Sequence, residues 1–137
     1  MTDKPRRQEY HSTRSLIDKL GVHMDAKVTV IGIEDEAFWL QLGERTHDIL
    51  VGRLRAECDI IFYAADSLAD LQQLASLKKH LISNGAIWVV SLKGKAAKIK
   101  DVDVIAAAKA AGLVDNKVVS FSETHTSLRL VIPVSLR

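Results

Sequence analysis

Three nearly continuous apolar runs divide the chain and predict buried strands. They cover residues 27–33 (KVTVIGI), 59–65 (DIIFYAA) and 86–92 (AIWVVSL). Strands that are covered on both faces, as in a parallel sheet, lack the apolar–polar alternation of half-buried strands. A shorter run, 47–51 (HDILV), predicts one further strand.

Helical patterns separate these runs. Helices are expected over residues 15–20, with Ser12 or Thr13 as the cap, and over residues 34–42, 67–83 and 101–111. The helix over 67–83 has the clearest pattern, because Ser67 and Asp70 can form a capping box and Asn84-Gly85 follows its last apolar position. Two strands at 117–122 and 128–134, joined by a short polar turn, are expected to pair antiparallel.

The order of these segments predicts the fold class. Strands that alternate with helices form an α/β protein, here a three-layer αβα sandwich with a Rossmann-like, mostly parallel sheet and an antiparallel C-terminal edge. One connection is unusually short. Only residues 52–58 separate the strand at 47–51 from the next one, whereas a parallel crossover normally needs a dozen or more residues. The strand at 47–51 is therefore either very short or not parallel to its successor.

The composition is that of an ordinary globular domain. Of 137 residues, 47% are hydrophobic and 26% charged, which fits one domain over 15–137 behind a polar tail at 1–14. The net charge of +2 is too small to indicate nucleic-acid binding. Cys58 is the single cysteine, and there is no signal peptide and no apolar run of about 18 residues. These features predict a cytoplasmic protein that does not enter a membrane.

The same segments resemble the class I methyltransferase fold. The resemblance rests on a helix that leads into "LISNGAIWVV", an Ala-rich helix that ends in "AAGLVDNKVVSF", and the final strand pair. More closely, "DIIFYAADSLADLQQLASLKKHLISNGAIWVVSLKGK" is similar to a bacterial family of short methyltransferase-like proteins known only as a domain of unknown function, number three-zero-five-two. The resemblance covers residues 15–133 and implies the fold, but it leaves the function open because one fold serves many functions.

The resemblance also implies where a cofactor would bind, at the carboxyl ends of the strands. Active methyltransferases carry a Gly-rich turn after the first strand, where the backbone approaches the cofactor closely. Here that turn has only Gly32, followed by Ile33 and three acids. In an altered site Glu34 or Asp35 could hold the amino group or the sulfonium of S-adenosylmethionine. Alternatively, these acids are simply the first turn of a helix, where the helix dipole favours them.

Two further positions at this edge are candidates. After the second strand the resemblance implies an acid that binds ribose hydroxyls, but the chain reads Val-Gly-Arg-Leu-Arg, so Arg53 and Arg55 could bind an anion or lie solvated. Asp66 follows the strand at 59–65 and is the best single candidate for a ligand contact. The competing interpretation makes Asp66 and Ser67 a helix cap.

A basic segment follows the strand at 86–92. Lys93, Lys95, Lys98 and Lys100 lie in one glycine-containing loop that could receive a phosphate, a nucleic acid or an acidic protein surface. The loop lacks the P-loop spacing and has no aromatic residues to stack bases. A solvated basic loop is the alternative. The five histidines show no metal-ligand spacing, so no metal is expected.

Together these features predict a non-catalytic methyltransferase-like domain that acts by binding a protein or an anionic ligand and uses no cofactor. The alternative is a divergent S-adenosylmethionine-dependent methyltransferase in which Glu34, Asp35 and Asp66 face the cofactor. The space beside Gly32 discriminates between them. A cleft filled by Ile33, Phe38 or Trp39 would exclude adenosine, whereas an open cleft of several hundred Å³ would favour an enzyme.

Overall fold

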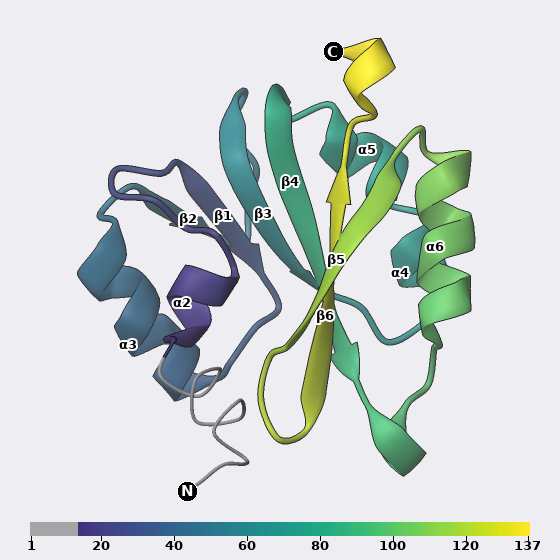
Figure 1. Ribbon diagram of the computed structural model, residues 1–137, viewed down its shortest axis with the longest axis horizontal. Helices are drawn as coiled ribbons and strands as arrows, with labels where there is room; N and C mark the ends of the chain where they lie inside the picture. The colour runs from purple at the N-terminus through teal and green to yellow at the C-terminus, as the bar shows by residue number, and fades with distance from the viewer. Residues whose placement is uncertain (1–13) are drawn as a thin grey trace, which may run out of the picture.

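The computed structural model describes residues 14–137, so the predicted tail at 1–14 lies outside it except for Arg14. One six-stranded sheet has the order β2-β1-β3-β4-β6-β5 (Figure 1). Its strands are β1 (Val28–Ile31), β2 (Ile49–Val51), β3 (Cys58–Ala64), β4 (Leu81–Leu92), β5 (Val114–Ser120) and β6 (His125–Val131). Strands β2, β1, β3 and β4 are parallel, and β6 runs antiparallel to both β4 and β5. The predicted sheet, mostly parallel with an antiparallel C-terminal edge, is confirmed.

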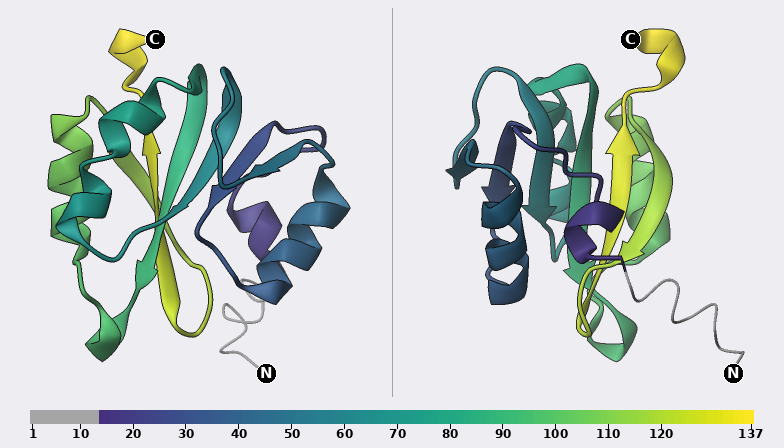
Figure 2. Two further views of the ribbon diagram at one scale, coloured as in Figure 1. Left: turned by 180° about the vertical axis from the view of Figure 1, so that it is seen from behind. Right: turned by 60° about the vertical axis from the view of Figure 1, so that its left-hand side comes forward.

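Helices cover both faces of this sheet. The helices are α2 (Leu16–Lys19), α3 (Glu36–Arg45), α4 (Leu68–Leu71), α5 (Leu74–Lys78) and α6 (Asp101–Ala110), with short 3₁₀ turns η1 (Gly94–Ala96) and η2 (Val134–Leu136). Figures 1 and 2 show α2 and α3 against one face and α4, α5 and α6 against the other. The expected three-layer αβα sandwich is therefore present, and its core consists of two buried clusters, one on each face.

Aromatic residues join α2 and α3 to their face of the sheet. The ring of Phe38, on α3, lies 4.9 Å from that of Phe62 and 5.0 Å from that of Phe121, measured between centroids. The indole N–H of the fully buried Trp88 donates to the carbonyl of Leu20, at 3.0 Å. Because a buried indole N–H needs an acceptor, this bond fixes the end of α2 over the centre of the sheet.

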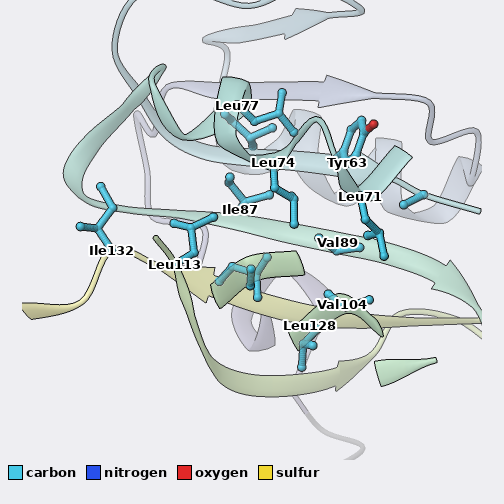
Figure 3. Packing of buried hydrophobic residues seen from close by; sticks show 14 of the residues in the cluster. Tyr63, Leu71, Leu74, Leu77, Ile87, Val89, Val104, Leu113, Leu128 and Ile132 are labelled. Carbon is cyan, nitrogen blue, oxygen red and sulfur yellow. The ribbon is translucent and has the colours of Figure 1, made fainter. Parts of the chain in front are cut away.

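Aliphatic residues fill the opposite face (Figure 3). Leu71 and Leu74 come from the short helices α4 and α5, Val104 comes from α6, and all three are buried in the cluster that includes Ile87 and Val89 of β4. Side chains of one strand that are two residues apart point to the same face, so these two β4 residues line this layer while Trp88 lines the other. The central strand is thus buried on both sides, as its apolar run predicts.

The connection from β2 to β3 resolves the alternative left open by the sequence. β2 has only three residues and is parallel to β1, so the strand is very short. Residues 52–57 cross back without a helix. The guanidinium of Arg55 forms an ion pair with Asp48 and donates to the carbonyl of Val28, while Leu54 packs against the core. These contacts hold a crossover that is too short to contain a helix.

The predicted helix over 67–83 is wrong at its C-terminal end. It is replaced by α4 and α5, and β4 already begins at Leu81. Asn84-Gly85 lies inside β4, where the pairing shifts from Cys58–Leu81 to Ile60–Ala86. A Cβ atom at Gly85 would lie 2.9 Å from the carbonyl oxygen of Asp59. Gly85 therefore permits a close approach of two strands and does not end a helix.

Other elements differ from the predictions by a few residues at their ends. The first helix is capped by Ser15, whose hydroxyl accepts from the N–H of Asp18; the expected caps at residues 12 and 13 lie outside the described residues. The second helix begins at Glu36 and extends to Arg45. Strand β5 begins at Val114, three residues earlier than expected. No helix within residues 14–137 has the length and apolarity that crossing a bilayer requires.

Candidate functional site

The carboxyl ends of β1 and β3 form the point at which the strand order reverses. The chain leaves β1 for β2 on one side and then returns past it to β3 on the other. Gly32 follows β1 with φ +80°, and a Cβ atom there would lie 3.2 Å from the Cβ of Ala64. Only glycine combines this backbone conformation with such proximity at low cost. Ligands of open α/β sheets bind outside strand ends of this kind, so this edge is the first candidate site.

The residues after Gly32 turn in different directions. Ile33 and Phe38 are buried in the core on the α3 face of the sheet. The indole N–H of the half-buried Trp39 donates to the carbonyl of Ile33, at 2.9 Å. Asp35 accepts from the N–H of Phe38 at 2.9 Å and so caps α3, whereas Glu34 is exposed. Of the two acids predicted here, one carboxylate is already used by the helix and the other faces solvent.

Asp66 follows β3 at the same edge. Its side chain is exposed, and it makes no hydrogen bond to any other described residue. The helix cap is formed by its neighbours, because the hydroxyl of Ser67 accepts from the N–H of Asp70 at 3.0 Å. The Asp70 carboxylate in turn accepts from the N–H of Asp66 at 2.8 Å. The cap therefore accounts for Ser67 and Asp70 but does not use the carboxylate of Asp66.

Tyr63 of β3 stabilises the turn between Asp66 and Asp70 by a hydrogen bond, a role that the sequence did not indicate. Its hydroxyl donates to the carbonyl of Asp70 at 2.9 Å. Burial, with a smaller effect of the Asp70 carboxylate, raises the pKa of the Tyr63 phenol. The phenol is therefore a neutral donor that fixes the start of α4. The continuous apolar run of β3 indicates that Tyr63 is buried, but not that its hydroxyl reaches this carbonyl.

The two predicted arginines lie at opposite ends of the strands. Gly52 and Arg53 follow β2 at the carboxyl edge, where the N–H of Gly52 donates to the carbonyl of Val30 and Arg53 is exposed. Arg55 has returned to the amino edge, where Asp48 neutralises its guanidinium. The end of β2 carries no carboxylate, because residues 51–53 are Val, Gly and Arg.

The carboxyl end of β4 opens into a cavity of about 290 Å³. It is lined by Ser91, Leu92, Lys93, Gly94, Ala97, Ile99, Lys100, Asp101 and Thr126. The ammonium group of Lys93 donates to the hydroxyl of Ser120 at 2.8 Å, and its backbone N–H donates to the carbonyl of Thr124. Lys95 is exposed in η1 and does not line the cavity. Two lysines, the start of α6 and the β5–β6 hairpin thus meet at this edge.

The other residue types that could carry out chemistry, namely metal ligands, the cysteine and the polar hairpin turn, do not form a site within residues 14–137. No group of three His, Cys, Asp or Glu side chains in residues 14–137 is arranged to hold a metal ion. Cys58 is buried, with its sulfur 3.2 Å from the hydroxyl oxygen of Thr29. The polar turn expected before the strand at 128–134 is shorter than predicted, because β6 already begins at His125 and only residues 122–124 of the polar segment lie in the turn.

Solved structures share the fold of this chain. Its structural neighbours are class I S-adenosylmethionine methyltransferases. One is the N-methyltransferase NodS from Bradyrhizobium japonicum WM9, solved with S-adenosyl-L-homocysteine (TM-score 0.63, 15% identity, 96% of this chain and 89% of that chain). Another is a TehB-like methyltransferase from Corynebacterium glutamicum (TM-score 0.57, 14% identity, 93% of this chain and 94% of that chain). At these identities the likeness establishes the fold alone.

Residues 18–134 match the model of a family described as a protein of unknown function, DUF3052. The chain belongs to this family, as its sequence resemblance implied. It covers 52% of the pyocyanin biosynthetic protein PhzM and 41% of the O-methyltransferase NcsB1 from neocarzinostatin biosynthesis, so it spans about half the length of these larger matches. No curated protein matches the chain.

Proposed function

We propose that this chain is a non-catalytic, methyltransferase-like domain that binds a small anionic ligand at the carboxyl edge of its sheet. The end of β2 carries this proposal. In nucleoside-binding folds of this type an acid about 20 residues beyond the glycine turn binds the ribose hydroxyls. Here the corresponding position after β2 is occupied by Gly52 and Arg53. The ribose hydroxyls of a nucleoside would therefore have no carboxylate to bind at the end of β2, whereas an anion could pair with the guanidinium of Arg53.

The cavity beside β4 supports the choice of an anion. Lys93 and Lys100 line it, and the hydrogen bond to Ser120 holds the Lys93 ammonium group in place before any ligand arrives. Asp101 of α6 also lines the cavity, so the two lysines would hold an anion beside one carboxylate. The cavity volume of about 290 Å³ lies near the lower end for small-molecule sites. A small phosphate-bearing molecule fits these features better than a nucleotide.

Calorimetry with two ligands tests the proposal. S-adenosylmethionine at millimolar concentration should give neither saturable heat nor a thermal shift, and saturable binding would reject the non-catalytic assignment. Pyrophosphate, as a probe for the lysine cavity, should bind, and the double variant K93Q/K100Q should weaken this binding by about tenfold or more, since charge-assisted hydrogen bonds are lost. The matched control K109Q removes an exposed lysine at the other end of α6 and should bind pyrophosphate as the unmodified protein does.

One observation favours the alternative function, a divergent S-adenosylmethionine-dependent methyltransferase. Gly32 retains the left-handed backbone that allows a cofactor to approach, and the exposed carboxylates of Glu34 and Asp66 follow the two strands of the switch point. In that case E34Q and D66N would each weaken S-adenosylhomocysteine binding, while D35N would mainly reduce stability because Asp35 caps α3. Equal binding by all three variants would contradict this assignment.

A further inference from the structure

A second cavity lies at the opposite, amino edge of the sheet. It has a volume of about 140 Å³ and is lined by Leu20, Gly21, His23, Asp59, Ile60, Ile82, Asn84, Ala86, Trp88 and Arg129. The residues that follow α2 form one wall, and β3, β4 and β6 form the other (Figure 1). None of these residues belongs to the site proposed above. Half of the lining residues are apolar, and the polar ones include Asp59, Asn84 and Arg129 from three different strands.

Arg129 is the charged group of this cavity. It lies on β6 directly opposite Trp88 of β4 and is half-buried. Its guanidinium forms no hydrogen bond and no ion pair with any residue in 14–137. Asp59 is the single acid among the lining residues, but it does not pair with Arg129, and one of its oxygens accepts from the N–H of Lys27 at 2.8 Å. A half-buried guanidinium that has no partner within residues 14–137 is available to pair with an external anion.

Neighbouring residues add to the positive charge. Lys117 of β5 pairs with Arg129 in the sheet register, and its ammonium group donates to the carbonyl of Lys19 at 2.8 Å. Burial and then the charge of Arg137 lower the pKa of Arg129, while burial and the charges of Arg14 and Arg129 lower that of Lys117. Lys117 and Arg137 therefore repel Arg129, which is the one of these cations that lines the cavity. A bound anion would relieve this repulsion.

We propose that this cavity is a binding site for a small oxyanion, a carboxylate or phosphate group, with Arg129 as its anchor. The planar guanidinium matches both groups by paired hydrogen bonds. The side-chain amide of Asn84, which also lines the cavity, can donate a further one. The volume is well below the roughly 300 Å³ at which ordinary small-molecule sites begin, so the site takes a single anionic group and not a nucleotide.

The two tryptophans provide a direct assay. Trp88 lines the cavity, and its indole N–H bonds to Leu20 of the opposite wall, whereas Trp39 lies on α3 outside the cavity. In a ¹⁵N spectrum each indole gives one signal, and the variant W39F assigns them. Sodium phosphate and sodium acetate are titrated separately, with sodium chloride keeping the ionic strength constant. The Trp88 signal should shift saturably with at least one anion, while the Trp39 signal does not follow it.

The anion that saturates identifies the group: phosphate alone indicates a phosphate site, and acetate alone or both indicate a carboxylate-accepting site. R129Q should weaken binding by about tenfold or more. Because Arg129 is half-buried, N84D serves as a second variant, which keeps the arginine and places a negative charge at an exposed lining residue. K95Q, at the opposite edge, is the matched control and should bind normally. The proposal is overturned if neither anion shifts Trp88 saturably, or if R129Q and N84D both bind like the unmodified protein.

Discussion

Replacing Gly32 by alanine should destabilise the fold through two separable effects. The first is the backbone, because φ at Gly32 is +80° and a residue with a Cβ atom loses about 1–2 kcal/mol in the left-handed region. The second is a contact, since the new Cβ would lie 3.2 Å from that of Ala64, which requires a small shift and adds about 1 kcal/mol. G32A should therefore lower the free energy of unfolding by about 2–3 kcal/mol.

Gly52 provides the matched control. Its φ is +74°, but a Cβ atom there would meet no heavy atom within 4 Å, so G52A should show the backbone effect alone. The difference between G32A and G52A then measures the contact with Ala64. A double-mutant cycle gives an independent value, because A64G removes the opposing methyl group and the pair G32A/A64G should be destabilised by about 1 kcal/mol less than the sum of its single variants.

Urea unfolding followed by tryptophan fluorescence measures these differences. The slope of the unfolding free energy against urea should stay constant, so that shifts of the midpoint report stability. Two results would count against the contact with Ala64: G32A costs no more than G52A, or the double-mutant cycle is additive within error. Either result would mean that Gly32 does not lie against the end of β3, and the geometry of the switch point would then be wrong.

Three further changes test other parts of the structure. F38A removes a fully buried ring that packs against three other aromatic rings and should cost about 3–5 kcal/mol in urea unfolding; a loss below about 1 kcal/mol would contradict this packing. D35A should cost about 1 kcal/mol through the lost α3 cap, and E34A should be nearly neutral; equal losses would argue against the cap. R45Q should raise the pKa of Asp18, which a hydrogen bond from Arg45 lowers, as followed by carboxyl-carbon NMR; an unchanged titration would contradict the pair. Because the folded pKa is lowered, the stabilisation that Asp18 provides is present above its unfolded pKa and is lost as the pH falls through the folded one.

The sequence predicts most of the fold because its strongest signals are local. Apolar runs mark β1, β3 and β4, and the alternation with helices determines a mostly parallel sheet. The end of the helix over 67–83 could not be predicted in this way. Leu81 fits an apolar helical stripe equally well, and it becomes the start of β4 only because it pairs with Cys58, a residue more than twenty positions away.

The candidate sites also differ in whether local sequence or contacts between distant segments determine them. The positions of Gly32 and Asp66 follow from the rule that ligands bind at the carboxyl ends of strands, so the sequence could place them. The separation of Arg53 from Arg55 depends on a crossover that turns back within a few residues. The position of Arg129 in the second cavity depends on the end of α2 and on β4, which are distant from it in the chain, and no local pattern distinguishes it from a solvated arginine.

We expect that the switch point between β1 and β3 does not receive a nucleoside. Backbone amide NMR with added S-adenosylhomocysteine tests this expectation, because Gly32 and Asp66 each contribute an amide signal at that position. Both signals should stay unchanged up to millimolar ligand. A saturable shift confined to these amides and their neighbours would contradict it and would favour the methyltransferase alternative.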